Sequence, residues 1–70
     1  MKLSEVKPEH EVTIERIEKG FQCTKRLLEL GIIPGTKVRI VKNISGRVIL
    51  GVKGSRIALG CGVSSNIFVK

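Results

Sequence analysis

The sequence predicts a mainly β fold, a small partly open barrel of about five short strands with one inserted short helix and a helical turn before the last strand. The chain has 70 residues, which is the size of one domain spanning residues 1–70. It has no Trp or Tyr and two Phe, so the core must come from Val, Ile and Leu, which suit a pleated sheet. Short alternating segments separated by turns would leave many open edges unless they curl into a barrel.

The first strand is expected over Glu11–Ile17, where apolar and polar residues alternate and Val12 and Ile14 point inward. Gly20 ends this segment. A short amphipathic helix should follow, with its start between residues 20 and 24. Its apolar face, at helical spacing, comprises Cys23, Leu27 and Leu30.

The end of this helix is the most specific local signal in the chain. Gly31 stands where a helix C-terminus favours a residue with positive φ, and Ile32 can then fold back onto Leu27 or Leu28. Pro34-Gly35 suits the two central positions of a type II turn, because proline presets φ and glycine accepts the positive φ that follows. A strand should therefore begin at residue 36.

The rest of the chain is predicted as a meander and one last strand. In residues 36–40, Val38 and Ile40 point inward, and the break in alternation at Val41-Lys42 indicates a bulge or a strong twist. A turn at 43–46 leads to a strand at 47–53 that points Val48, Leu50 and Val52 inward. A hairpin turn at 53–55 leads to a strand at 56–59, and a helical turn at 63–66 precedes a strand at 67–69.

The net charge of +7 is unevenly distributed. All six acidic residues lie in the first 29 positions, where six Lys or Arg balance them, whereas residues 30–70 contain seven basic residues and no acid. Clustered on a few strand faces, these produce a positive potential that attracts phosphate, anionic lipid or an acidic protein surface. The simpler alternative is that they only keep the strand faces solvated. The seven are Lys37, Arg39, Lys42, Arg47, Lys53, Arg56 and Lys70.

Groups for catalysis or metal binding are scarce. His10 is the only histidine, and the chain has no aspartate to orient it. His10, Cys23 and Cys61 have no recognisable metal-ligand spacing. We therefore expect no enzymatic activity, no cofactor and no metal bound within one chain. Iron sensing or metal carriage through these three residues is the alternative.

The sequence favours a cytoplasmic protein without membrane insertion. No apolar segment precedes Pro8, so no secretory signal is visible, and Cys23 and Cys61 are expected to be reduced thiols. The longest apolar stretch, Val48–Val52, is far below the roughly 20 residues needed to cross a bilayer.

Nucleic acid is the main alternative ligand, since the basic second half could contact phosphates. However, the chain lacks Tyr and Trp for base stacking, and Phe21 and Phe68 are expected next to core positions. We therefore predict no sequence-specific binding to nucleic acid, and keep a basic nucleic-acid- or ribosome-associated barrel as the alternative function. The lack of aromatic residues also excludes a proline-binding groove lined by aromatic rings.

Residues 25–38 (KRLLELGIIPGTKV), followed by GSRIALG at 54–60 and IFV at 67–69, resemble the ferrous iron transport protein A (FeoA) family. The resemblance implies an SH3-like barrel. A related first string occurs in the C-terminal SH3-like domain of iron-dependent transcriptional repressors. Because 70 residues from Met1 leave no space for DNA-binding and dimerisation regions, we expect the transport family. The chain departs from the pattern at Cys61, where a basic residue is expected between the two glycines.

The resemblance implies a cytoplasmic accessory role in bacterial ferrous iron uptake, beside the ferrous iron transport protein B permease, a membrane protein with a GTP-binding domain. No catalytic residue is carried over. On this basis we expect an adaptor that acts by protein–protein contact with the cytoplasmic portion of the permease. A metal-responsive SH3-like module is an alternative, and the oligomeric state is open, weak self-association included.

Strand parity predicts where such a contact surface lies. Ile49 should be on the face opposite Val48 and Leu50, beside Gly51, whose missing side chain leaves a shallow step. Either the helix or a partner would cover Ile49. The predicted partner-binding surface is this apolar residue inside a basic rim, comprising Lys37, Arg39, Ile49 and Lys53.

Overall fold

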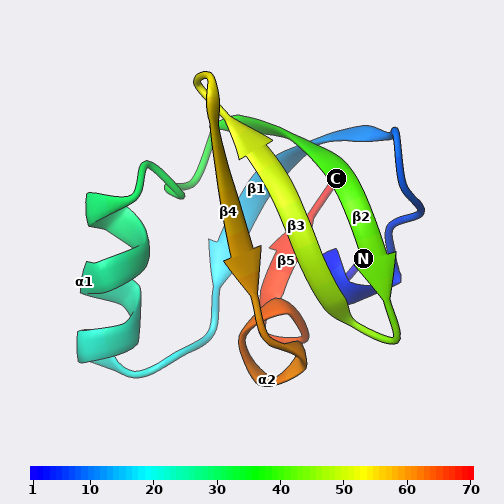
Figure 1. The fold of residues 1–70 in the computed structure, drawn as a ribbon. Coiled ribbons are helices and arrows are strands. Elements are labelled where there is room, and N and C mark those ends of the chain that lie inside the picture. The colour runs from blue at the N-terminus through cyan, green and yellow to red at the C-terminus, as the bar shows by residue number, and fades with distance from the viewer.

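The computed structural model describes all 70 residues and contains one five-stranded antiparallel sheet in the order β4-β3-β2-β1-β5. In Figure 1, β4, β3 and β2 lie in front of β1 and β5, and α1 stands to one side, beyond β4. The sheet curls, and β4 and β5 do not pair, so the barrel is partly open, as predicted. The elements are η1 (Leu3–Glu5), β1 (Glu11–Ile17), α1 (Phe21–Glu29), β2 (Lys37–Ile44), β3 (Arg47–Val52), β4 (Ser55–Leu59), α2 (Cys61–Ser64) and β5 (Ile67–Val69).

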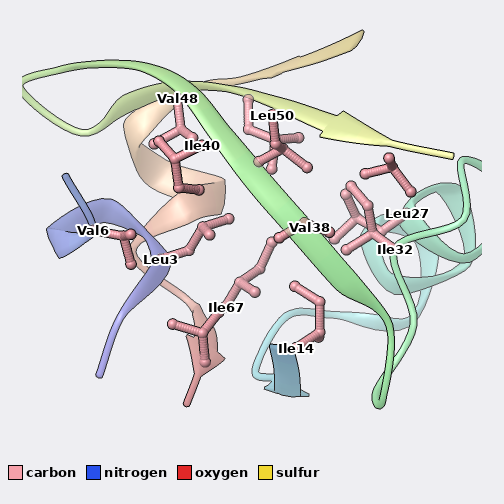
Figure 2. Packing of buried hydrophobic residues seen from close by; sticks show 13 residues of the cluster. Leu3, Val6, Ile14, Leu27, Ile32, Val38, Ile40, Val48, Leu50 and Ile67 are labelled. Carbon is pink, nitrogen blue, oxygen red and sulfur yellow. The ribbon is translucent and has the colours of Figure 1, made fainter. Parts of the chain in front are cut away.

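The core is a single cluster of 13 buried apolar residues between the front and rear strands. Strand alternation places its central members, and the predicted inward positions on β2 and β3 are all buried. Figure 2 shows Leu27 and Ile32 at the α1 end of the core, and Leu3 and Val6 at the other end. Val12 is only half-buried, because it packs at the margin of the cluster.

The predicted helix end is confirmed in detail. The Ile32 amide donates to the Leu27 carbonyl at 2.9 Å and the Gly31 amide donates to the Leu28 carbonyl at 3.0 Å, which is a Schellman motif. Gly31 has φ +91°, and Ile32 is fully buried. The type II turn is also present, since Gly35 has φ +93° and the Thr36 amide donates to the Ile33 carbonyl at 3.1 Å.

The helix packs less of its surface than predicted. It begins at Phe21 with Gly20 as its N-cap, and only Leu27 is buried. Leu30 is 46% exposed and Phe21 is 79% exposed, so placing these two at or beside the core was wrong. The physical reason is that α1 lies beside edge strand β4 and not across the sheet (Figure 1), so that most of its side chains stay outside the core.

Strand β2 contains the predicted bulge, as a register shift between Ile40 and Lys42. The strand then continues to Ile44, so the turn predicted over 43–46 is shorter, a two-residue turn at Ser45-Gly46 with φ +52° and +90°. Both positive φ values identify a type I′ hairpin. Asn43 stays in the strand because its side-chain amide donates to the carbonyls of Ser4 and Val6 at 3.0 and 2.7 Å.

The N-terminal residues, for which the sequence pattern predicts no helix or strand, complete the core. Leu3 and Val6 are buried, and the Val69 amide donates to the Met1 carbonyl at 2.8 Å. The helical turn α2 also begins earlier than predicted, at Cys61, and its buried Ser64 hydroxyl donates to the Gly46 carbonyl. These contacts close the end of the barrel that carries both short helical segments.

Candidate functional site

The outer face of β2, β3 and β4, defined as the side turned away from the core, carries most of the unbalanced charge. Residues paired across antiparallel strands point to the same side, so the register gives the rows of this face. The first row is Arg39, Gly51 and Arg56, the second is Lys42, Ile49 and Ala58, and the third is Ile44 and Arg47.

A shallow apolar groove of about 390 Å³ lies over the second and third rows. Ile49 forms its half-buried floor, and Ile44, 59% exposed, forms one side. Lys42 and Arg47 bring their charges to its rim. The structure therefore contains an apolar patch with basic neighbours around Ile49, the kind of surface that the sequence predicted.

Not all the predicted residues converge on this groove. Lys37 and Arg39 are exposed on β2, before the bulge, and Lys53 occupies the β3–β4 hairpin turn with φ +48°. Arg39 is one row away from Ile49, and Lys53 is at the opposite end of β3 from Arg47. The role of Lys37, Arg39, Ile49 and Lys53 in binding stays a prediction.

Lys42, Ile44 and Arg47 are neighbours of Ile49 that strand parity did not predict. The signal was available, because a bulge inserts one residue and reverses the alternation beyond it. Restarting the alternation at Lys42, after the bulge, would have turned Lys42 and Ile44 outward beside Ile49, as the register shows.

The helix does not cover Ile49, although the sequence left this open. No α1 residue lines the groove over Ile49. Instead, α1 forms a separate hollow of about 710 Å³ with the free edge of β4, on whose walls Phe21 and Leu30 stand beside Cys23. Lys25, Arg26 and Glu29 also line this hollow, so its charge is mixed.

Charges are neutralised on one side of the barrel and left free on the other. Arg16 makes both ion pairs of the structure, to Glu18 at 2.6 Å and Glu15 at 3.1 Å, and its guanidinium lies 4.2 Å from the Phe68 ring centroid. The hydrogen bond to Glu18 raises the pKa of Arg16 above its ordinary value. None of the seven basic residues after position 30 has an acidic partner within 4 Å.

The thiols and the histidine are dispersed. Cys23 is half-buried and Cys61 exposed, both as free thiols, and His10 is exposed. No group of three or more His, Cys, Asp or Glu side chains lies close enough together to hold a metal ion. Neither α-helix has the length and apolar composition needed to cross a bilayer.

Five short antiparallel strands curled around one aliphatic core, with two short helices and an exposed basic face, define a small SH3-like barrel. The FeoA domain family model matches residues 1–70, and the chain belongs to this family. It is 37% identical, over 97% of its own length and 83% of the relative's, to "Putative Fe(2+) transport protein A" of Methanocaldococcus jannaschii.

Solved structures share this fold. The crystal structure of an iron uptake regulatory protein, FeoA, superposes with a TM-score of 0.91 at 27% identity and covers 100% of this chain and 95% of that one. FeoA from Chlorobium tepidum gives a TM-score of 0.89 at 21% identity, covering 99% and 68%. The IdeR structure from T. acidophilum matches at 0.88 and 23% identity, but this chain spans only 32% of its length, so that likeness concerns the fold alone.

Proposed function

We propose that this protein is a non-enzymatic accessory protein of ferrous iron uptake that works in the cytoplasm by docking on the cytoplasmic portion of the ferrous iron transport protein B permease. The observation that carries the proposal is the match of residues 1–70 to the FeoA domain. The relative named as an Fe(2+) transport protein A supports the transport role.

The outer face of β2, β3 and β4 supports docking as the mode of action. It combines an apolar groove around Ile49 with basic side chains that make no ion pair within 4 Å. An apolar patch inside a polar rim is typical of a protein–protein interface, and unpaired cations steer an acidic partner to it. These basic side chains are exposed in the free protein. The free-energy cost of removing water from them therefore arises when the complex forms and not when the chain folds.

The test is binding to the detergent-solubilised permease of the same organism, measured by surface plasmon resonance. Ile49→Glu places a carboxylate in the apolar groove, and Lys53→Glu reverses a charge on the predicted rim. We expect the first to lower affinity at least tenfold and the second to lower it several-fold, mainly through slower association. Lys19→Glu, the same charge change in the exposed segment between β1 and α1, is the matched control and should bind normally.

If both Ile49→Glu and Lys53→Glu bind like the wild type, the proposed surface is wrong. If the wild type itself does not bind the permease, the docking role is wrong. Circular dichroism of each variant establishes that a loss of binding does not come from unfolding.

A further inference from the structure

Gly51 lies in the middle of β3, where a glycine weakens a strand. Its φ is not positive, so the backbone does not require glycine there. A Cβ added at Gly51 would meet only the Val41 Cγ2 atom, at 3.9 Å, which is an ordinary van der Waals distance. Neither a positive φ nor a close contact at the Cβ position requires the absence of a side chain.

The neighbours of Gly51 suggest what the missing side chain makes room for. Its cross-strand partners are Arg39 on β2 and Arg56 on β4, so two exposed arginines flank the glycine on the outer face. With strands about 4.8 Å apart, the two arginine Cα atoms are roughly 10 Å from each other, which leaves an open step between them. Neither arginine makes an ion pair within 4 Å, although exposed Glu11 of β1 is the cross-strand neighbour of Arg39, on the side of Arg39 away from Gly51.

We infer that Arg39, Gly51 and Arg56 form a carboxylate-binding notch, which receives an Asp or Glu side chain from an acidic segment of the partner protein. Each guanidinium presents a planar set of donors that matches a carboxylate bidentately. Gly51 allows the partner chain to approach the sheet closely, with the Val41 methyl group as an apolar wall. This inference rests on the proposed docking function and names the chemistry of the partner.

The apolar groove beside the notch favours an acidic polypeptide over a nucleic acid. The next row of the same face is Lys42, Ile49 and Ala58, so a partner that seats its carboxylate in the notch also covers Ile49. A phosphate backbone would gain from the cations but would bury no aliphatic side chain there, and no exposed Tyr or Trp is present for base stacking. A partner segment with alternating acidic and apolar side chains would place a carboxylate in the notch and an apolar side chain in the groove over Ile49.

The decisive variant is Gly51→Val. Valine favours a strand, and a Cβ at this position meets only the Val41 Cγ2 atom at 3.9 Å, so we expect the melting temperature to stay the same or rise, while affinity for the solubilised permease falls at least tenfold. A purely structural role for Gly51 would lower the melting temperature instead. Arg56→Gln should also weaken binding without unfolding. Gly62→Ala, another glycine with free space and no positive φ but located in α2, is the control and should bind normally.

A second measurement does not depend on the permease. In ¹H–¹⁵N NMR spectra at low salt, a short peptide of alternating Glu and Leu should shift the Gly51 amide and the Nε–H signals of Arg39 and Arg56, and a Gln-Leu peptide of equal length should not. Shifts spread evenly over all basic residues, or stronger shifts of the same signals by a short RNA, would overturn the inference.

The two failures are distinguishable. If the wild type binds the permease and Gly51→Val binds it equally well, the notch is wrong and the docking function stands. If the wild type does not bind the permease, the docking function is wrong. The peptide titration then decides whether the notch binds carboxylates.

Discussion

The β1–β5 side of the barrel and the outer face of β2, β3 and β4 use arginine in opposite ways. Arg16 on β1 is held by Glu15 and Glu18 and stacks on Phe68 of β5, so its charge is satisfied within the chain. Arg39, on the neighbouring strand β2, makes no ion pair within 4 Å, although Glu11 of β1 lies opposite it in the sheet register. Two paired strands thus carry one arginine that is bound by ion pairs within the chain and one that is not.

The same division runs through a single strand, β3. Its inward residues Val48, Leu50 and Val52 are buried and belong to the core cluster, whereas Ile49 and Gly51 face outward. Folding fixes the identity of the inward set through packing. Folding places little constraint on the outward residues of β3. Contact with a partner would explain why an isoleucine and a glycine stand there.

The largest expected effect tests this division of β3. Leu50→Ala removes a fully buried side chain and should lower the free energy of unfolding by about 2–5 kcal/mol. Ile49→Ala removes a half-buried side chain from an open groove, so its loss should be less than half as large. Guanidinium denaturation measures both. Equal losses would mean that Ile49 is structural and that the outer face is not reserved for a partner.

A smaller effect compares two glycines. Gly31 has φ +91° at the end of α1, and a Cβ there also meets the Val52 side chain at 3.5 Å, so Gly31→Ala should cost about 1 kcal/mol or more. Gly51→Ala should be neutral or stabilising by up to about 1 kcal/mol, because alanine restricts the unfolded chain without strain in the strand.

Thermal unfolding of the two alanine variants, side by side with the wild type, is the measurement. A destabilised Gly51→Ala protein would show that the strand itself needs this glycine, and the contrast between the two positions would be lost.

These two glycines also show what the sequence could reveal. The Gly31 to Gly35 signal is local, because positive φ and a proline turn are encoded by the residues that adopt them, and both the helix end and the type II turn that it predicts are present. The significance of Gly51 depends on Arg39 and Arg56, which only the sheet register brings beside it. Sequence alone gave the outward face of Ile49 but not its neighbours.

The N-terminal segment was missed for a related reason. Leu3 and Val6 have no strand or helix period, and their burial depends on long-range hydrogen bonds from Asn43 to the carbonyls of Ser4 and Val6. In contrast, the hydrophobicity of Phe21 predicts a position near the core, but α1 lies beside edge strand β4 and leaves Phe21 exposed. Both outcomes are set by tertiary packing, which overrides local pattern.

The smallest expected effect sharpens the comparison of the two arginines. Arg16→Gln removes both ion pairs and the contact with Phe68, so the melting temperature should fall, by less than in Gly31→Ala, since the pairs are exposed. Part of this loss should disappear in 1 M salt, because screening already weakens the ion pairs of the wild type. Arg39→Gln should lower the melting temperature less than Arg16→Gln or not at all, because Arg39 makes no ion pair within 4 Å and its cross-strand neighbour Glu11 is exposed. If Arg39→Gln were as destabilising as Arg16→Gln, and equally sensitive to salt, then Arg39 would have an internal partner and the outer face would not be free to bind an acidic segment.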